Sequence, residues 1–83
     1  MQTKQENNFY KTKDQMLAAL LYATGYVLES TDWTAGVCYF CFADKLKCEQ
    51  TIFEYYKGKI IINAKLLFDS FQTIKNILFA RQF

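Results

Sequence analysis

Apolar side chains recur at helical spacing near the start of the chain. From residue 16 onward they return every three or four positions, which is the spacing of one buried helix face. Thr12 and Gln15 match the capping box that begins many helices, and Gly25 suits the left-handed position that ends them. The pattern predicts a helix over residues 13–24, preceded by a flexible polar tail over residues 1–9.

The next stretch is rich in β-branched and aromatic residues. Residues 26–30 and 37–42 both have strand composition, and turn-forming residue types fill the segment 32–36 between them. The pattern predicts an antiparallel hairpin with Trp33 at the tip of its loop. Because residues 37–42 are apolar on both faces, we expect this strand to be central, or to meet a partner through its outer face.

A second helical pattern lies between Asp44, which suits an N-cap, and Gly58, which suits a helix stop. It predicts a helix over residues 45–57 with one apolar stripe and further apolar residues beside that stripe. The stripe consists of Cys48, Ile52 and Tyr55, and the residues beside it are Leu46, Phe53 and Tyr56.

The last part of the chain gives the clearest pattern. A β-branched run over residues 59–62 predicts a third strand, and Asn63 then caps a helix over residues 64–80 in which the helical period is sustained. The predicted order is α-β-β-α-β-α, which is typical of an α+β fold with a small, mostly antiparallel sheet. We expect the long C-terminal helix to lie on the sheet, across the face that carries Phe40 and Phe42.

Length and composition favour one compact domain with an exposed aromatic surface. Eighty-three residues form a single core, which we assign to residues 10–83. Hydrophobic residues make up 52% of the chain and aromatic residues 18%, more than so small a body can bury completely. Exposed apolar patches usually mark an interface, so this composition indicates a partner or self-association as a possible homodimer.

Net charge and the search for targeting signals restrict the kinds of partner and the cell compartment that we expect. The formal net charge is +2, well short of a dedicated nucleic-acid coat. The first residues do not resemble a signal peptide, and no apolar run is long enough to span a bilayer. Three cysteines, an odd number, do not make a closed disulfide framework. We therefore expect a cytoplasmic protein with no membrane partner.

Little in the sequence predicts catalysis. No histidine occurs, and Cys38 and Cys41 lie within one strand, so that their thiols point to opposite faces. A zinc site needs about four ligands, and a redox pair needs a cysteine at a helix N-terminus. Ordinary core cysteines are the favoured interpretation, and the carboxylates fall on solvated helix faces. We expect no enzyme activity, no catalytic residues, no metal and no cofactor.

One basic and aromatic segment suggests nucleic-acid binding. Lysines interleaved with tyrosines can follow a phosphate backbone while bases stack on the rings. The alternative is that the tyrosines are partly core and the lysines only keep the end of a helix soluble. The candidate nucleic-acid residues are Lys45, Lys47, Tyr55, Tyr56, Lys57 and Lys59.

The hairpin offers a second candidate surface, for a protein partner. Val37, Tyr39 and Cys41 share the face of their strand opposite Phe40 and Phe42. Trp33 either packs back over the core or stays exposed for a partner. An exposed Trp33 would be a candidate binding hot spot.

Several short motifs resemble those of a small uncharacterised domain family, a domain of unknown function that is associated with bacteria, phages and mobile elements. The resemblance covers about residues 9–80, and Tyr56 departs from it because family members often have Trp there. It implies a self-standing compact domain in a mobile-element setting, and it carries no catalytic residues. The matching motifs are Tyr10-Lys11-Thr12-Lys13-Asp14, Leu17-Ala18-Ala19, Gly25-Tyr26, Phe40-Cys41-Phe42 with Asp44, Tyr55-Tyr56-Lys57-Gly58, Asn63-Ala64 and Lys75.

These observations together predict a small non-enzymatic binding module. The first hypothesis is a phage- or mobile-element-encoded module that acts on nucleic acid or on a nucleic-acid-handling protein or complex. The alternative is a protein-interaction module, such as an inhibitor, adaptor or small subunit, with no nucleic-acid contact.

Overall fold

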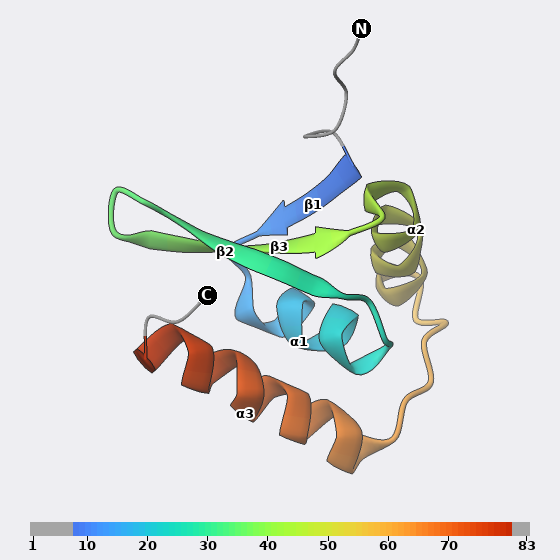
Figure 1. Ribbon diagram of the computed structural model, residues 1–83. Helices are drawn as coiled ribbons and strands as arrows, with labels where there is room; N and C mark the ends of the chain where they lie inside the picture. The colour runs from blue at the N-terminus through green and yellow to red at the C-terminus, as the bar shows by residue number, and fades with distance from the viewer. Residues whose placement is uncertain (1–7, 81–83) are drawn as a thin grey trace, which may run out of the picture.

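A computed structural model describes residues 8–80 and shows sheet and helices around one core (Figure 1). Within that range there are three helices and a three-stranded antiparallel sheet, which confirms the predicted α+β class. The observed order, β-α-β-β-α-α, differs from the predicted order in the placement of one strand. The elements are β1 (Phe9–Thr12), α1 (Gln15–Ala23), β2 (Leu28–Thr34), β3 (Val37–Ala43), α2 (Lys45–Tyr56) and α3 (Ala64–Ala80).

The sheet has the order β1-β3-β2, so the aromatic strand is central, as predicted. Both of its neighbours run antiparallel to it. Phe40 and Phe42 are fully buried on the face that meets the helices, while Val37 and Tyr39 lie on the other face. The apolar character of both faces of β3 follows from its central place.

The start of the chain corrects two predictions. Residues 1–7 of the predicted tail lie outside the described residues, but Phe9 begins β1, which pairs with β3 and brings Thr12 opposite Phe40. The predicted capping box is also wrong, because the N-cap of α1 is Asp14. Four residues are too few to display a strand period, so sequence pattern alone missed β1.

Hydrogen bonds show how the chain turns from β1 into α1. The Asp14 carboxylate accepts from the backbone N–H of Met16 at 2.9 Å and of Leu17 at 3.0 Å. The Thr12 hydroxyl oxygen accepts from the backbone N–H of Asp14 at 3.0 Å, so it supports the cap instead of forming it. The helix accordingly begins at Gln15 and not at residue 13.

The hairpin is longer and tighter than predicted. β2 continues to Thr34, and Ala35 and Gly36 alone form the turn, with φ angles of 52° and 80°. Positive φ at both central residues is the turn geometry that matches the twist of antiparallel strands. Trp33 therefore lies within β2 opposite Cys38 and not at the tip of a loop.

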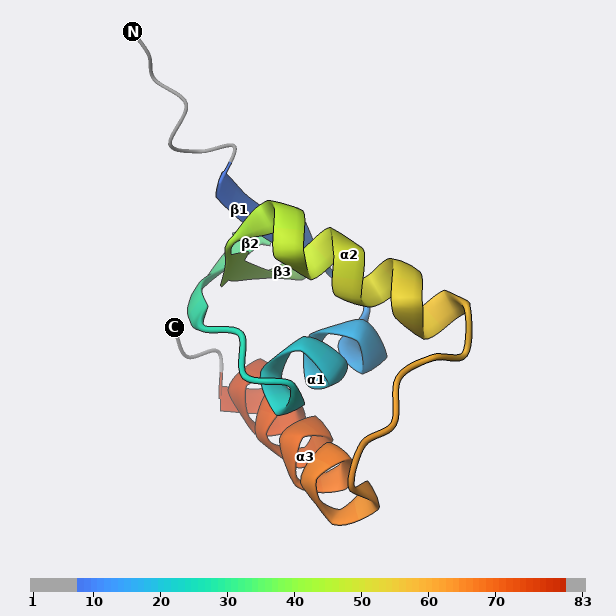
Figure 2. The same ribbon diagram turned by 90° about the vertical axis from the view of Figure 1, so that its right-hand side faces the viewer.

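The predicted third strand over residues 59–62 is wrong, because that stretch is an irregular connection between α2 and α3. β1 occupies the edge of β3 that a third strand would need. In Figures 1 and 2 the connection runs down the side of the molecule, away from the sheet.

The long helix has its predicted bounds, but it does not lie directly across the Phe40 and Phe42 face of the sheet as predicted, because α1 takes that place (Figure 1). α3 covers Ala64–Ala80, and the side-chain oxygen of Asn63 accepts from the backbone N–H of Leu66 at 3.0 Å. Ile74 and Ile77 enter the same core as Phe40 and Phe42. In both views α1 lies between the sheet and α3, which packs chiefly against α1 (Figures 1 and 2).

Candidate protein-binding surface

Helix α2 stands at one end of the sheet and carries most of the predicted nucleic-acid residues (Figure 1). Tyr26 anchors it: the phenol oxygen lies 2.7 Å from Thr51 Oγ1 and donates to the carbonyl of Lys47 at 3.1 Å. Asp44 occupies the N-cap position, as predicted, but in a left-handed conformation and without a side-chain bond to the helix. The helix is therefore held mainly by packing and by Tyr26.

The inner face of α2 is buried, and its cysteine is not reactive. Cys48 and Ile52 belong to the core cluster, and the Cys48 thiol donates to the carbonyl of Ala43 at 3.3 Å. Burial, with smaller contributions from the charges of Asp44 and Glu49, raises the pKa of Cys48 to about 11. The thiol stays neutral near pH 7, which suits a core residue and not a nucleophile.

The outer face of α2 is apolar as well. Leu46, Phe53 and Tyr56 expose 67%, 63% and 69% of their surface. Leu46 and Phe53 are two helical turns apart on the side opposite Cys48, and Tyr56, three residues further on, lies between that side and the inner face. We call these three residues the outer stripe of α2. The prediction placed them beside the stripe of Cys48, Ile52 and Tyr55; the structure leaves them exposed, and of that stripe it buries Cys48 and Ile52 but not Tyr55.

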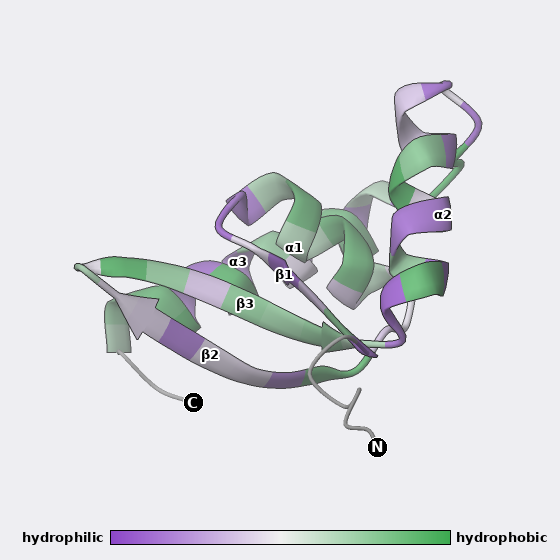
Figure 3. Cartoon of the chain, turned by 90° about the horizontal axis from the view of Figure 1, so that it is seen from above, coloured by the Kyte–Doolittle hydropathy of each residue, from purple (hydrophilic) through white to green (hydrophobic). Residues whose placement is uncertain are grey.

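Apolar residues on both sides make α2 unusual for a surface helix. A typical surface helix has one apolar face and one polar face, and a helix that is apolar all round is buried. Along α2, hydrophobic and hydrophilic positions alternate without a clean division (Figure 3). Within residues 8–80, the side chains of the outer stripe stay about two-thirds exposed. The helix thus has apolar residues that the rest of the fold does not bury.

The candidate nucleic-acid residues form two groups at opposite ends of α2. Lys45 and Lys47 are exposed in the first turn, and the other four lie at the far end, about 15 Å away at helical rise. The rings of Tyr55 and Tyr56 are tilted to each other with centroids 5.3 Å apart. The structure therefore brings the tyrosines together with Lys57 but not with Lys45.

Charge on this helix is nearly balanced. The Lys57 ammonium lies 3.8 Å from a Glu54 carboxylate oxygen and 4.8 Å from the centre of the Phe53 ring. Asp44 and Glu49 lie near the two lysines at the other end of the helix. Carboxylates set among the lysines weaken the positive field that a phosphate backbone needs.

An open pocket of about 460 Å³ lies at the N-terminal end of α2. Its lining combines two carboxylates, one lysine and one apolar side chain. Over residues 8–80 no cluster of three or more metal-ligating residues occurs. The lining residues are Asn8, Asp44, Lys45, Leu46 and Glu49.

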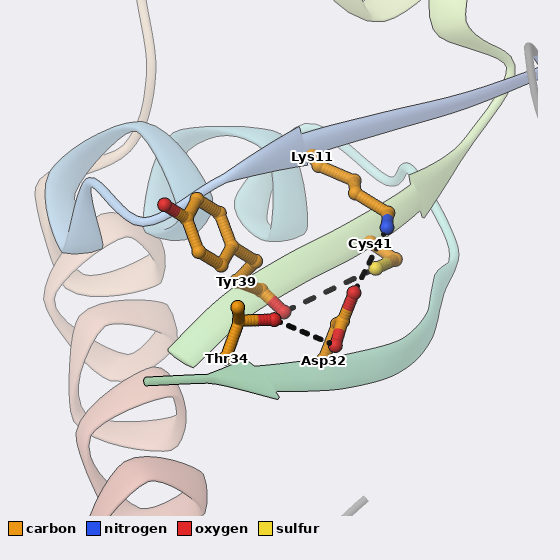
Figure 4. Close-up of polar contacts among 5 residues, drawn as sticks. All are labelled: Lys11, Asp32, Thr34, Tyr39 and Cys41. Atoms are coloured by element: carbon orange, nitrogen blue, oxygen red, sulfur yellow. Dashed lines mark hydrogen bonds and ion pairs between the residues drawn. The ribbon is translucent and has the colours of Figure 1, made fainter. Parts of the chain in front are cut away.

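The outer face of the sheet carries the predicted protein-interaction residues of β3. Lys11 of β1 reaches over Cys41 to Asp32 of β2, with 3.0 Å between Nζ and Oδ2 (Figure 4). Cys41 is consequently buried, while Tyr39 is half-buried and Val37 is exposed. This ion pair divides the face and leaves Val37 and Tyr39 as its accessible apolar part.

The ion pair shifts the pKa of both side chains. The hydrogen bond from Lys11, then its charge, then a hydrogen bond from the Thr34 hydroxyl lower the pKa of Asp32. The same hydrogen bond, together with the negative charge of Asp32, raises the pKa of Lys11. Sequence reasoning missed this pair because it depends on β1, which the pattern did not reveal.

Trp33 takes the first of its two predicted alternatives. It is half-buried in β2 and packs against the core cluster. Its ring thus helps to close the core beneath the hairpin. The surface left for a partner is the outer stripe of α2 more than the hairpin.

No helix within residues 8–80 combines the length and the apolar character that crossing a bilayer requires. Neither the curated proteins nor the solved structures include a match to this chain. A family model does match, over residues 7–80, which is most of the chain and close to the extent of the resemblance in the sequence. The chain therefore belongs to the family described as Domain of unknown function (DUF5659).

Proposed function

We propose that this domain is a non-enzymatic protein-binding module and that its outer stripe of α2 docks on a partner. One observation carries the proposal: α2 carries exposed apolar side chains outside its inner face, and only the inner face is covered among the described residues. Burying a large aromatic or aliphatic side chain contributes roughly 1.5–3 kcal/mol. Three such side chains on one rigid helix are the ingredients of a binding hot spot.

The rim of the stripe suits a protein surface. Glu49, Gln50 and Lys57 flank Leu46 and Phe53, so that an apolar centre has a mixed polar border. That arrangement is typical of protein interfaces, where charge is depleted at the centre and retained at the edge. The Lys57 ammonium over the Phe53 ring also restrains that ring before a partner binds.

Co-purification from cells that produce the protein naturally tests the proposal. A Leu46→Asp/Phe53→Asp variant should lose a protein partner that the parent retains after nuclease treatment. The matched control is Phe68→Asp/Phe79→Asp, which places the same two charges at exposed aromatic positions of α3 and should keep the partner. If the α3 variant loses the partner, or the α2 variant keeps it, the proposal fails.

A second candidate function is nucleic-acid binding, favoured by the paired rings of Tyr55 and Tyr56 beside Lys57 and Lys59. Stacked bases on such rings, with lysines on the phosphates, would favour single strands. Fluorescence anisotropy with a labelled oligonucleotide checks this: Lys57→Ala/Lys59→Ala should weaken binding and reduce its salt dependence. An affinity that changes neither with salt concentration nor in the lysine variant would contradict nucleic-acid binding through this segment.

The setting is also a proposal. The resemblance in the sequence implies a phage or mobile-element origin. Three free, buried cysteines suit a reducing cytosol.

A further inference from the structure

The connection between α2 and α3, residues 59–63, has the character of a strand without a neighbour. Three consecutive isoleucines occupy its middle. Burial alternates along it, since Ile60 and Ile62 are half-buried while Lys59, Ile61 and Asn63 are exposed. A period of two, with alternate residues turned toward the body, is the pattern of a strand laid on a core.

The backbone in the middle of this segment, residues 60–62, is unpaired within residues 8–80. Among the described residues, no backbone hydrogen bond involves Ile60, Ile61 or Ile62, although the bonds on either side, from Lys59 to Glu54 and from Leu67 to Asn63, are present. Ile61 is 98% exposed, the most exposed large apolar side chain among residues 8–80. Free donors and acceptors on a β-branched segment are what an extended chain can pair with.

We propose that this segment pairs, antiparallel, with the same segment of a second copy of the chain. Centred on Ile61, such pairing sets the two Ile61 side chains directly opposite each other and sets Ile60 opposite Ile62 of the second copy. Cross-strand pairs of β-branched residues stabilise a sheet, and here they cover the most exposed side chain.

Charge permits a second copy as the occupant and favours the antiparallel direction. In antiparallel pairing Lys59 faces the neutral Asn63 of the second copy, whereas parallel pairing would set Lys59 against Lys59. The other nearby lysines are already neutralised within their own chain: Lys57 lies 3.8 Å from Glu54, and Lys65 lies 2.7 Å from Asp69. Two copies can therefore approach without uncompensated repulsion between these residues.

The dimer is expected to be weak. Five residues on each side fall short of the roughly 20–30 residues of a standard interface, so association belongs in the micromolar range or above. The pairing segment is separate from the outer stripe of α2. The self-association can thus fail while the protein partner is retained, and the reverse.

Sedimentation equilibrium of the full chain, from about 10 μM to about 1 mM, tests the proposal. The parent should dimerise, and Ile61→Asp should raise the dissociation constant about tenfold or more by setting two carboxylates face to face. Val27→Asp is the matched control, because Val27 is β-branched, 59% exposed and outside the segment. Its dimerisation should equal that of the parent.

Hydrogen exchange supplies a second readout that depends on the backbone alone. In a paired strand alternate amides are protected, so either Ile61 alone or Ile60 and Ile62 together should exchange more slowly at high protein concentration. A chain that stays monomeric over the whole range, a dimer that survives Ile61→Asp, or unchanged exchange across residues 60–62 would each overturn the proposal.

Discussion

Lys11 and Asp32 lie on the two edge strands and meet above the central one, with 3.0 Å between Nζ and Oδ2. Twenty-one positions separate them in the chain. The contact ties β1 to β2 over Cys41 and Tyr39, on the face of the sheet opposite Phe40 and Phe42 (Figure 4). A surface pair of this kind adds little to stability.

The titration of Asp32 should report this contact. Its pKa lies below the ordinary value of 3.8, so the carboxylate favours the fold above that value, and this contribution disappears as pH falls through the folded-state pKa. In Lys11→Met the pKa should rise toward 3.8, as measured by NMR titration of the side chain. Lys13→Met is the control and should leave it unchanged. An Asp32 pKa that is the same in all three proteins would show that the pair does not form.

The β2–β3 turn holds a residue that is not suited to it. Ala35 has a φ of 52°, a left-handed conformation that disfavours a side chain with a Cβ but suits Asn, and Gly36 completes the turn with a φ of 80°. Ala35→Asn should raise the free energy of unfolding by about 0.5–1 kcal/mol, because Asn-Gly is the preferred pair in this turn.

Urea denaturation measures the effect of that change. Gly36→Ala, the opposing control, should lower the free energy of unfolding by about 1 kcal/mol although nothing lies within 4 Å of the added methyl. Equal stability of all three proteins would exclude the left-handed turn.

The Cys48 thiol should resist labelling in the folded protein. With a pKa of about 11, only about one thiol in a thousand is ionised at pH 8, and the side chain is fully buried. In a Cys38→Ala/Cys41→Ala background, a chromogenic disulfide reagent should react with Cys48 only as fast as the protein unfolds. The same protein in guanidinium chloride should react at once. Fast labelling without denaturant would mean that α2 is not packed as described.

Helix α3 should depend on one residue at its centre. Ile74 is fully buried in the core that also holds Phe40 and Phe42, so Ile74→Ala should destabilise the protein by about 2–5 kcal/mol. Phe79→Ala, on the exposed side of the same helix, should change stability by less than about 1 kcal/mol. Thermal unfolding followed by circular dichroism distinguishes the two. Similar losses from both would contradict the observed facing of α3.

The parts of the fold that sequence pattern predicted are those with long or strong local signals. α3 repeats its period over seventeen residues, and β3 is a continuous apolar run. β1 has four residues, too few for a period, and its place depends on the free edge of β3. Residues 59–62 have strand composition but pair with no strand among residues 8–80, because β1 takes the edge of β3 and the connection runs away from the sheet (Figure 1).

The candidate surface was only partly predictable for a related reason. The excess of aromatic residues correctly indicated exposed apolar area, yet it did not say where. Leu46 and Phe53 lie on the same short helix as Cys48 and Ile52, and only the packing of the other elements decides which side of α2 is covered. Likewise the Lys11–Asp32 pair needs the register of three strands before it can be seen.

Site-specific photo-crosslinking tests the central claim, that the outer stripe of α2 docks on a protein, most directly. A photoreactive phenylalanine analogue at Phe53, 63% exposed, should form a covalent adduct with one polypeptide in cells that produce the protein naturally. The adduct should survive nuclease and disappear when Leu46→Asp is added, while the same analogue at Phe79 should form none. An adduct only to nucleic acid, or equal adducts from both positions, would contradict the claim.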